Sequence, residues 1–310
     1  MLSLVLATSN APSLYRDKRD WLRLYESQLT EGIPAPRELA AETDEVLDDH
    51  LTRIKHAQAA LQERLGSVRP DALVVIGYDD GVMFNRVQVP QFCTYTGAEM
   101  TGSSAIAALG EAVEDHKVTL KCNPEMAWEI HRELIDREFD MSYMSVQNPQ
   151  GRPEWGASSA FLYPGASFLD GLDIPLIPVL INCRVDPMPS GGRCLDFGTA
   201  LGQILDGLPQ KFAVMAVGGL SHDPNGARAG WVDERLDRFV MDRAVRRGNA
   251  QRLRQMFDLE SDAIQGGTGQ IRTWLAAAAA AESVKARGQI IDYIPSYRAI
   301  TGLGFAAWTV

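Results

Sequence analysis

Residues 212–223 read Phe-Ala-Val-Met-Ala-Val-Gly-Gly-Leu-Ser-His-Asp. The first six are apolar, and a short continuous apolar run is typical of a strand that is covered on both faces. The two glycines that follow allow the backbone to turn sharply and to approach a ligand closely. The segment therefore predicts a buried strand whose end places His222 at the rim of a sheet.

Further apolar runs of the same kind predict more strands of this sheet, at 2–7, 72–77 and 174–181. Helical patterns lie between them. Apolar residues over 47–65 share one helical face, with Thr43 or Asp44 as the cap, and Asn123-Pro124 is a favourable helix start.

A long helix is also expected over 268–286. Strands that alternate with helices predict an α/β fold of three layers, in which helices flank a mostly parallel or mixed sheet. We expect a single domain over 1–310, with a helical insertion at about 14–68. The loop-like stretch 147–165 is expected to be either a lid or wall of a binding site, or an ordinary surface excursion.

Composition narrows the class of protein. The chain has 310 residues, 45% of them hydrophobic and 23% charged, which are ordinary globular values. A net charge of −10 disfavours a nucleic-acid partner. No run approaches the roughly 18 to 20 apolar residues of a membrane span. Without a basic flank before the first apolar run, and with four cysteines that show no CxxC spacing, we expect a cytoplasmic protein with reduced thiols.

Polar residues follow three of the predicted strands, where α/β sheets bind their ligands. These residues are Ser9 and Asn10, then Tyr78, Asp79 and Asp80, and finally Ser221 and His222. Because histidine titrates near neutral pH, His222 is the candidate for proton transfer, unless it only hydrogen-bonds its own loop. Of the two adjacent aspartates, we expect one to cap a turn and the other to bind a metal or a substrate hydroxyl, and the sequence does not choose between them.

Residues 218–222, with Gly226-Ala227-Arg228-Ala229-Gly230 and Asp233, resemble a motif of the class III extradiol ring-cleavage dioxygenases of the LigB type. Ser9-x-x-Pro12 and 74–80 resemble the family's opening Ser-His-x-Pro and its metal loop. Weaker matches lie at 124–128, 138–141, 189–194 and 271–275. The resemblance spans nearly the whole chain and implies one α/β domain with the site at one end of the sheet. It also implies that His222 is an acid/base beside the iron.

The same resemblance shows departures at the iron ligands. Family members hold Fe(II) with two histidines and one glutamate. Asn10 stands at the position of the first histidine, Gly81 at that of the second, and residues 266–270 contain no carboxylate. Because an amide is a weak ligand and glycine has no side chain, we expect no iron there and no other cofactor.

The favoured hypothesis is a metal-independent enzyme that uses His222 as a general acid/base on an aromatic or cyclic acid. Asn10, Ser9, Tyr78, Asp79, Asp80 and Ser221 are the candidate substrate-binding residues. Arg193 or Arg228 is expected to hold a carboxylate, unless each forms only a structural ion pair.

Two alternatives stay open. In the first, the chain is a non-catalytic subunit that pairs with a related iron-bearing chain. In the second, it is an extradiol dioxygenase with displaced ligands. In the second case Asp79, Asp80 and His222 would hold Fe(II). The resemblance also implies a homo-oligomer or a pair with a related subunit.

Overall fold

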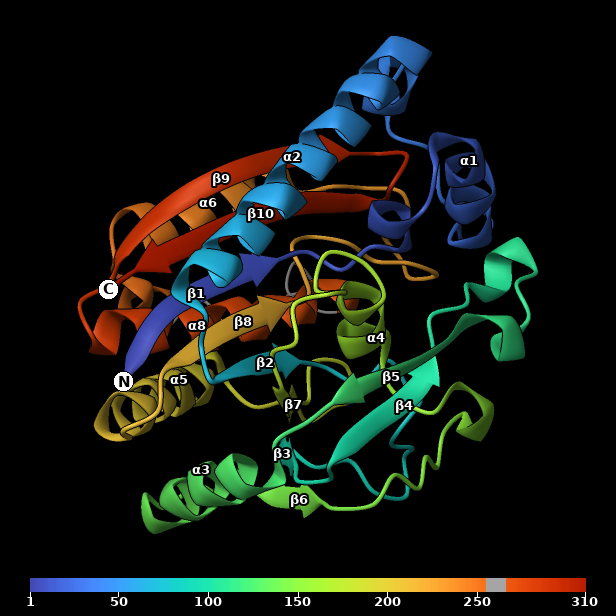
Figure 1. The fold of residues 1–310 in the computed structure, drawn as a ribbon. Helices are drawn as coiled ribbons and strands as arrows, with labels where there is room; N and C mark the ends of the chain where they lie inside the picture. The colour runs from blue at the N-terminus through green and yellow to red at the C-terminus, as the bar shows by residue number, and fades with distance from the viewer. Residues whose placement is uncertain (255–265) are drawn as a thin grey trace.

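Within residues 1–254 and 266–310, which the computed structural model describes, eight strands form one mixed sheet (Figure 1). These strands are β1 (Leu2–Thr8), β2 (Ala72–Gly77), β3 (Phe92–Tyr95), β6 (Ser142–Met144), β7 (Leu176–Ile181), β8 (Phe212–Val217), β9 (Arg287–Ser296) and β10 (Thr301–Thr309). Their order is β6-β3-β7-β2-β8-β1-β10-β9. The four predicted strands are confirmed, and they are the four neighbours at the centre of the sheet.

The central strands β7, β2, β8 and β1 are parallel, whereas β3 and β10 run antiparallel to their inner neighbours. Every residue of β2, β7 and β8 is buried. This burial explains why these segments read as continuous apolar runs rather than as alternating patterns. The strand expected to start at residue 174 begins two residues later, at Leu176.

Helices cover both faces of the sheet, which confirms the three-layer α/β fold (Figure 1). On one face α5 (Gly191–Gly207) packs against α8 (Ile271–Ser283) and α3 (Pro124–Asp136). On the other face α2 (Asp44–Val68) lies across β1, β9 and β10, and α4 (Ser159–Gly165) packs on β2. The remaining elements are α1 (Lys18–Ser27), α6 (Glu234–Met241) and a small sheet of β4 (Glu99–Ser103) and β5 (Lys117–Lys121).

Several predicted boundaries need correction. The helix expected over 268–286 covers only 271–283, because the glycine-rich residues 266–270 form a 3₁₀ turn before it. The stretch 147–165 is not a loop throughout, because its last seven residues form α4. The start at Asn123 is confirmed, since its side-chain oxygen accepts a hydrogen bond from the Met126 N–H at 3.0 Å. Helices α1 and α2 occupy most of 14–68, while the description of that region as an insertion stays a prediction.

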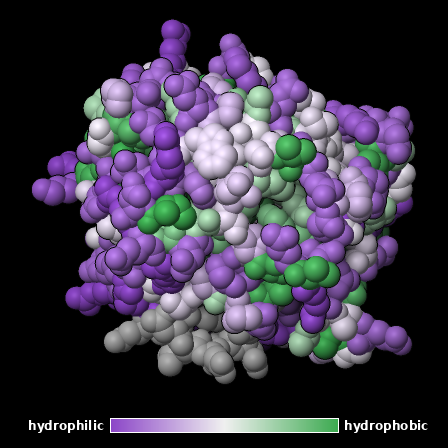
Figure 2. All heavy atoms as spheres, turned by 90° about the horizontal axis from the view of Figure 1, so that it is seen from below, coloured by the Kyte–Doolittle hydropathy of each residue, from purple (hydrophilic) through white to green (hydrophobic). Residues whose placement is uncertain are grey.

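The surface shows two further features. Among the described helices, none combines the length and apolar character that crossing a lipid bilayer requires. On the face shown in Figure 2, hydrophilic side chains predominate and hydrophobic ones form small separate groups. That face therefore offers no broad apolar surface, and the expected oligomer stays a prediction.

Helices α5 and α8 are in close contact on one face of the sheet. Helix α8 is fully buried from Ile271 to Ala281, and its alanines leave little space between the two helices. A Cβ atom on Gly198 of α5 would lie 2.0 Å from the backbone oxygen of Ala276. The two helix backbones therefore approach more closely than any side chain at this position allows.

We expect Gly198→Ala to lower the free energy of unfolding by about 2 kcal/mol, because the added methyl group forces the two helices apart. Urea denaturation followed by circular dichroism measures this change. The matched control is Gly207→Ala on the same helix, where a Cβ atom meets nothing within 4 Å. Equal stability of the two variants would contradict the close-packing explanation.

Candidate active site

The carboxyl ends of the adjacent parallel strands β1, β8 and β2 open onto a cavity of about 490 Å³. The ends are level, since Thr8 of β1 pairs with Val217 of β8. Polar residues from the strand ends and nearby loops line the cavity, among them Asn10, Tyr78, Asp80, Arg152, Ser159, Tyr163, Arg184, His222 and Gln270. The structure thus brings together residues that are distant in the sequence, such as Asn10 and Gln270, which are 260 positions apart.

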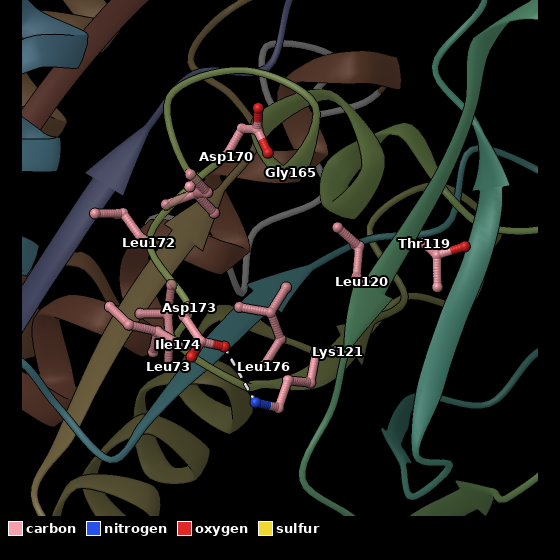
Figure 3. Close-up of a pocket in the computed structure, with 12 residues that line it drawn as sticks. Leu73, Thr119, Leu120, Lys121, Gly165, Asp170, Leu172, Asp173, Ile174 and Leu176 are labelled. Atoms are coloured by element: carbon pink, nitrogen blue, oxygen red, sulfur yellow. Dashed lines mark hydrogen bonds and ion pairs between the residues drawn. The ribbon is translucent and has the colours of Figure 1, made fainter.

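A smaller cavity of about 180 Å³ lies at the opposite end of the sheet, near Leu73 and Leu176 at the starts of β2 and β7 (Figure 3). Its one drawn polar contact joins Lys121 to Asp173 at 3.1 Å, and both side chains are exposed. Because α/β sheets bind ligands beyond the carboxyl ends of strands, we place the candidate site at the larger cavity.

His222 lies on the cavity wall in a defined orientation. Its Nδ1 is 2.8 Å from the carbonyl oxygen of Leu220, so the nitrogen carries the proton and donates it. Its backbone is fixed by Thr268, whose hydroxyl accepts from the His222 N–H at 3.1 Å and lies 3.0 Å from the His222 carbonyl oxygen. Burial lowers the pKa of His222 below its ordinary value of 6.5. The ring is therefore neutral at pH 7, and its Nε2 is an unprotonated base with no hydrogen bond to the described residues.

Ser221 supports this histidine rather than lining its cavity. The Ser221 N–H and hydroxyl both donate to the Asp237 carboxylate at 2.8 Å, and the hydroxyl accepts from the Asp233 N–H at 2.9 Å. Tyr293 donates to the same carboxylate at 2.8 Å. Because its hydroxyl both donates and accepts a hydrogen bond within the protein, Ser221 anchors the turn that precedes the histidine.

Asn10 and Tyr78 form a pair at the inner end of the cavity. The Asn10 amide nitrogen donates to the Tyr78 hydroxyl at 3.0 Å and to Ser159 at 3.3 Å. The Asn10 carbonyl oxygen is buried and has no hydrogen-bond partner. Burial raises the pKa of Tyr78 to about 12, so its phenol stays protonated. An unpartnered acceptor in a cavity wall marks a place where a ligand donor would bind.

The two adjacent aspartates have different roles. Asp79 accepts hydrogen bonds from four successive backbone N–H groups, those of residues 81–84, at 2.9 to 3.2 Å. It is therefore the turn cap. Asp80 lines the cavity, and its buried Oδ1 has no hydrogen bond. Gly81, which the resemblance placed at the second histidine, lines a neighbouring cavity instead, so the cavity-facing position of this turn belongs to Asp80.

Two other predicted residues lie outside the cavity. Ser9 is fully buried and joins β1 to β10, since its hydroxyl donates to Gly302 at 3.0 Å and accepts from Gly304 at 2.9 Å. Arg193 donates to the Glu138 carbonyl and lies over the ring of Phe139. These contacts commit both side chains to the fold, so neither is placed to bind a ligand here.

Arg228 lines an adjacent cavity of about 520 Å³, which shares His222 with the first and is also lined by Ser221. The first cavity is also lined by three residues that were not predicted from the sequence, Arg152, Arg184 and Gln270. Arg184 follows the predicted strand 174–181, as the other candidates follow theirs, so the same strand-end signal would have found it. Gln270 lies within the stretch searched for a carboxylate, where an amide was overlooked.

The side chains at the cavity do not fit a centre of two histidines and one carboxylate. The Gln270 side-chain oxygen accepts from the Gly219 N–H at 3.0 Å, and His222 is the single imidazole among the lining residues. Asp79, which was expected to bind a metal together with Asp80 and His222, instead accepts hydrogen bonds from backbone N–H groups with both carboxylate oxygens. In the described parts of the chain, no group of three or more His, Cys, Asp or Glu side chains is arranged to hold a metal ion.

Comparison with known proteins gives a family and two groups of named relatives. A profile described as the catalytic LigB subunit of aromatic ring-opening dioxygenase matches residues 38–304. Gallate dioxygenase of Pseudomonas putida is 28% identical over 177 residues, which are 56% of this chain and 50% of that protein. A 2,3-dihydroxyphenylpropionate/2,3-dihydroxicinnamic acid 1,2-dioxygenase of Escherichia coli is 29% identical over 182 residues, 58% of this chain and 51% of that protein. The matched region spans about half the length of these curated relatives.

Among solved structures, an uncharacterized protein from Escherichia coli K12 has a similar fold. The TM-score is 0.50 at 14% sequence identity, and the match covers 98% of this chain and 99% of that one. At this identity the likeness concerns the fold alone.

The buried carboxyl group of Asp237, which accepts hydrogen bonds from Ser221, makes the stability of the protein depend on pH. Burial raises the pKa of Asp237 to about 7, from an ordinary value of 3.8. Between these two values the folded chain binds more protons than the unfolded chain, so stability falls as the pH rises from about 4 to about 7. Because asparagine does not titrate, we expect the free energy of unfolding of Asp237→Asn to fall less steeply over this pH range, by roughly 1 kcal/mol per pH unit. Urea denaturation at several pH values measures it, with the exposed Asp206→Asn as control; parallel slopes for the two variants would disprove it.

Proposed function

The chain belongs to the LigB family of aromatic ring-opening dioxygenases, and from this premise we propose that it is an enzyme that transfers protons through His222 on an aromatic or cyclic acid, without an iron centre. The observation that carries the proposal is His222 itself, whose Nδ1–H is held by Leu220 and whose ring lines the cavity. A neutral imidazole at a cavity wall is suited to act as a general base at pH 7.

The donor set supports the absence of iron from the proposed reaction. The cavity holds Asn10, Asp80 and Gln270, which offer two amides and one carboxylate. Ferrous iron in oxygenases is held by two imidazoles and a carboxylate, and neutral amide oxygens are weaker ligands for it. Both amides also hold neighbouring groups, so they serve better as hydrogen-bonding groups for a substrate than as metal ligands.

The proposed role of each group follows from its contacts. His222 Nε2 takes a proton from the substrate, and the Leu220 carbonyl stabilises the imidazolium that forms. The same nitrogen then returns the proton to a different atom of the substrate or to water. The unpartnered oxygen of Asn10 accepts a hydrogen bond from a hydroxyl group of the substrate, and the Tyr78 phenol remains a donor. Isomerisation and decarboxylation use this transfer within the substrate. Hydrolysis uses it with water as the source of the proton and the leaving group as its acceptor.

We expect His222→Ala to lower kcat/KM by about 10²- to 10⁴-fold, because the variant has no group to transfer the proton. Gallate and 2,3-dihydroxyphenylpropionate are the first probes, since they appear in the names of the relatives, and consumption is followed by chromatography with a chelator present. His56→Ala, on the exposed side of α2, is the matched control. Turnover that persists in the His222 variant would show that the base lies elsewhere.

The pH dependence of kcat/KM gives a separate test. Only the neutral imidazole accepts a proton, and the pKa of His222 lies below 6.5 because of burial. We therefore expect kcat/KM to rise with pH through that pKa and to be level near pH 7. In His222→Gln the acidic limb should disappear together with most of the activity. An identical limb in this variant would assign the titration to another group.

Ring cleavage with displaced ligands is tested by metal content. The protein is incubated anaerobically with Fe(II), desalted and assayed for iron, and oxygen uptake is then followed with catechol. The proposal expects less than one iron per chain and turnover that a chelator does not change. Stoichiometric iron together with catechol-dependent oxygen uptake would overturn the metal-independent mechanism and restore the ring-cleaving one.

A further inference from the structure

We propose that Arg152 and Arg184 together bind the carboxylate of the substrate at the mouth of the His222 cavity. The inference rests on the proposed function, since it names the part of an anionic substrate that this site would recognise. It also replaces the expectation that Arg193 or Arg228 has this role, because neither of them lines the cavity.

The two arginines come from different loops and meet at one backbone group. Arg152 lies before α4, and Arg184 follows β7. Each donates a hydrogen bond to the carbonyl oxygen of Asp80, at 3.2 Å from Arg152 and at 3.3 Å from Arg184. Because both bond the same oxygen, the two guanidinium groups are held close together on the wall of one cavity.

Each guanidinium keeps donors for a ligand. The group has five N–H donors, and a planar carboxylate matches two of them. In the described residues, the hydrogen bond to Asp80 is the only one that either side chain makes. Arg152 also lies 3.9 Å from the Asp80 carboxylate and 5.5 Å from the centre of the Trp155 ring, which restrict its movement without occupying its remaining N–H groups.

The charge of the cavity favours an anion. The chain as a whole carries a net charge of −10. Among the residues that line this cavity, Asp80 is the single acid, whereas Arg152 and Arg184 are both cationic and His222 is neutral. The lining is therefore positive by one charge in an acidic protein. Such a local reversal of sign attracts an anionic ligand and concentrates it at the site.

The exposed fractions of the lining side chains show which way a bound ligand would point. The Arg152 side chain is 44% exposed and that of Asp80 is 24% exposed, while Asn10 is only 8% exposed. The cations thus lie at the outer end of the cavity, and the unpartnered Asn10 oxygen lies at the inner end. A substrate with a carboxylate at one end and hydrogen-bond donors at the other would satisfy both ends at once. The reactive part then lies inside, on the side of Asn10 and Tyr78.

A purely structural role is the competing explanation, in which the arginines only fix the turn at Asp80. A pair of ligands that differ in charge separates the two explanations. Gallate carries a carboxylate, and 3,4,5-trihydroxybenzamide has nearly the same shape without the charge. Loss of a carboxylate site weakens the binding of gallate alone, whereas a distorted turn weakens both ligands equally.

The experiment measures the dissociation constants of both ligands by calorimetry, for the unmodified protein and for Arg152→Gln and Arg184→Gln. We expect each variant to bind gallate about tenfold more weakly and to bind the amide within about twofold of the unmodified protein. Arg193→Gln is the matched control, because this arginine lies over Phe139 outside the cavity. It should change neither constant.

Equal weakening of both ligands, unchanged binding of gallate, or no measurable binding of gallate by the unmodified protein would each overturn the carboxylate site. His222→Gln separates this inference from the proposed function. If that variant binds gallate normally and the arginine variants do not, the carboxylate site stands whether or not His222 proves to be the catalytic base.

Discussion

The parallel pairing of β1, β8 and β2 is the constraint on which the site depends. Three neighbouring strands that run in one direction and end at the same level place their following residues at one edge. Asn10, Tyr78, Asp80 and His222 reach the cavity for this reason alone. Hydrogen bonds of the sheet, rather than any attraction between these side chains, bring them together. The Asn10 side-chain oxygen and Asp80 Oδ1 can therefore stay without a hydrogen bond and available to a ligand.

Buried hydrogen bonds around the cavity hold this edge of the sheet in place. Asp237 receives three hydrogen bonds, two from Ser221 and one from Tyr293, directly behind His222. Ser9 ties the end of β1 to β10, and Asp79 caps the turn that presents Asp80. Buried polar groups with all their partners satisfied make a rigid frame, since each lost partner would leave an expensive unpaired group. The frame is thus polar and closed, whereas the cavity that it supports has open positions.

The chain combines the fold of its family with a set of polar groups at the strand ends. The family profile covers most of the chain, and the relatives it matches are named as dioxygenases. At the cavity, however, amides and a single carboxylate accompany one imidazole. A cavity that retains an oriented, neutral histidine has the means for proton transfer. In the function that we propose, the two arginines that line it attract the anionic part of the substrate.

The sequence by itself determined the class of fold and the four central strands, and it predicted a site at the segment that contains His222. Continuous apolar runs and glycine turns are local signals, so the residues alone carry them. The same signals missed β3 and β6, which are short, and β9, which is partly exposed. They also missed β10, which is buried but carries Thr301, Gly302 and Gly304 in place of a continuous apolar run.

Only the tertiary structure decided which polar residues act together. The roles of Asp79 and Asp80 could not be assigned from the sequence, because they depend on which carboxylate reaches the backbone N–H groups of the turn. The sequence also could not prefer Arg152 and Arg184 to Arg193 and Arg228. The position of a long side chain depends on loops that are distant in sequence and adjacent only after the sheet has formed.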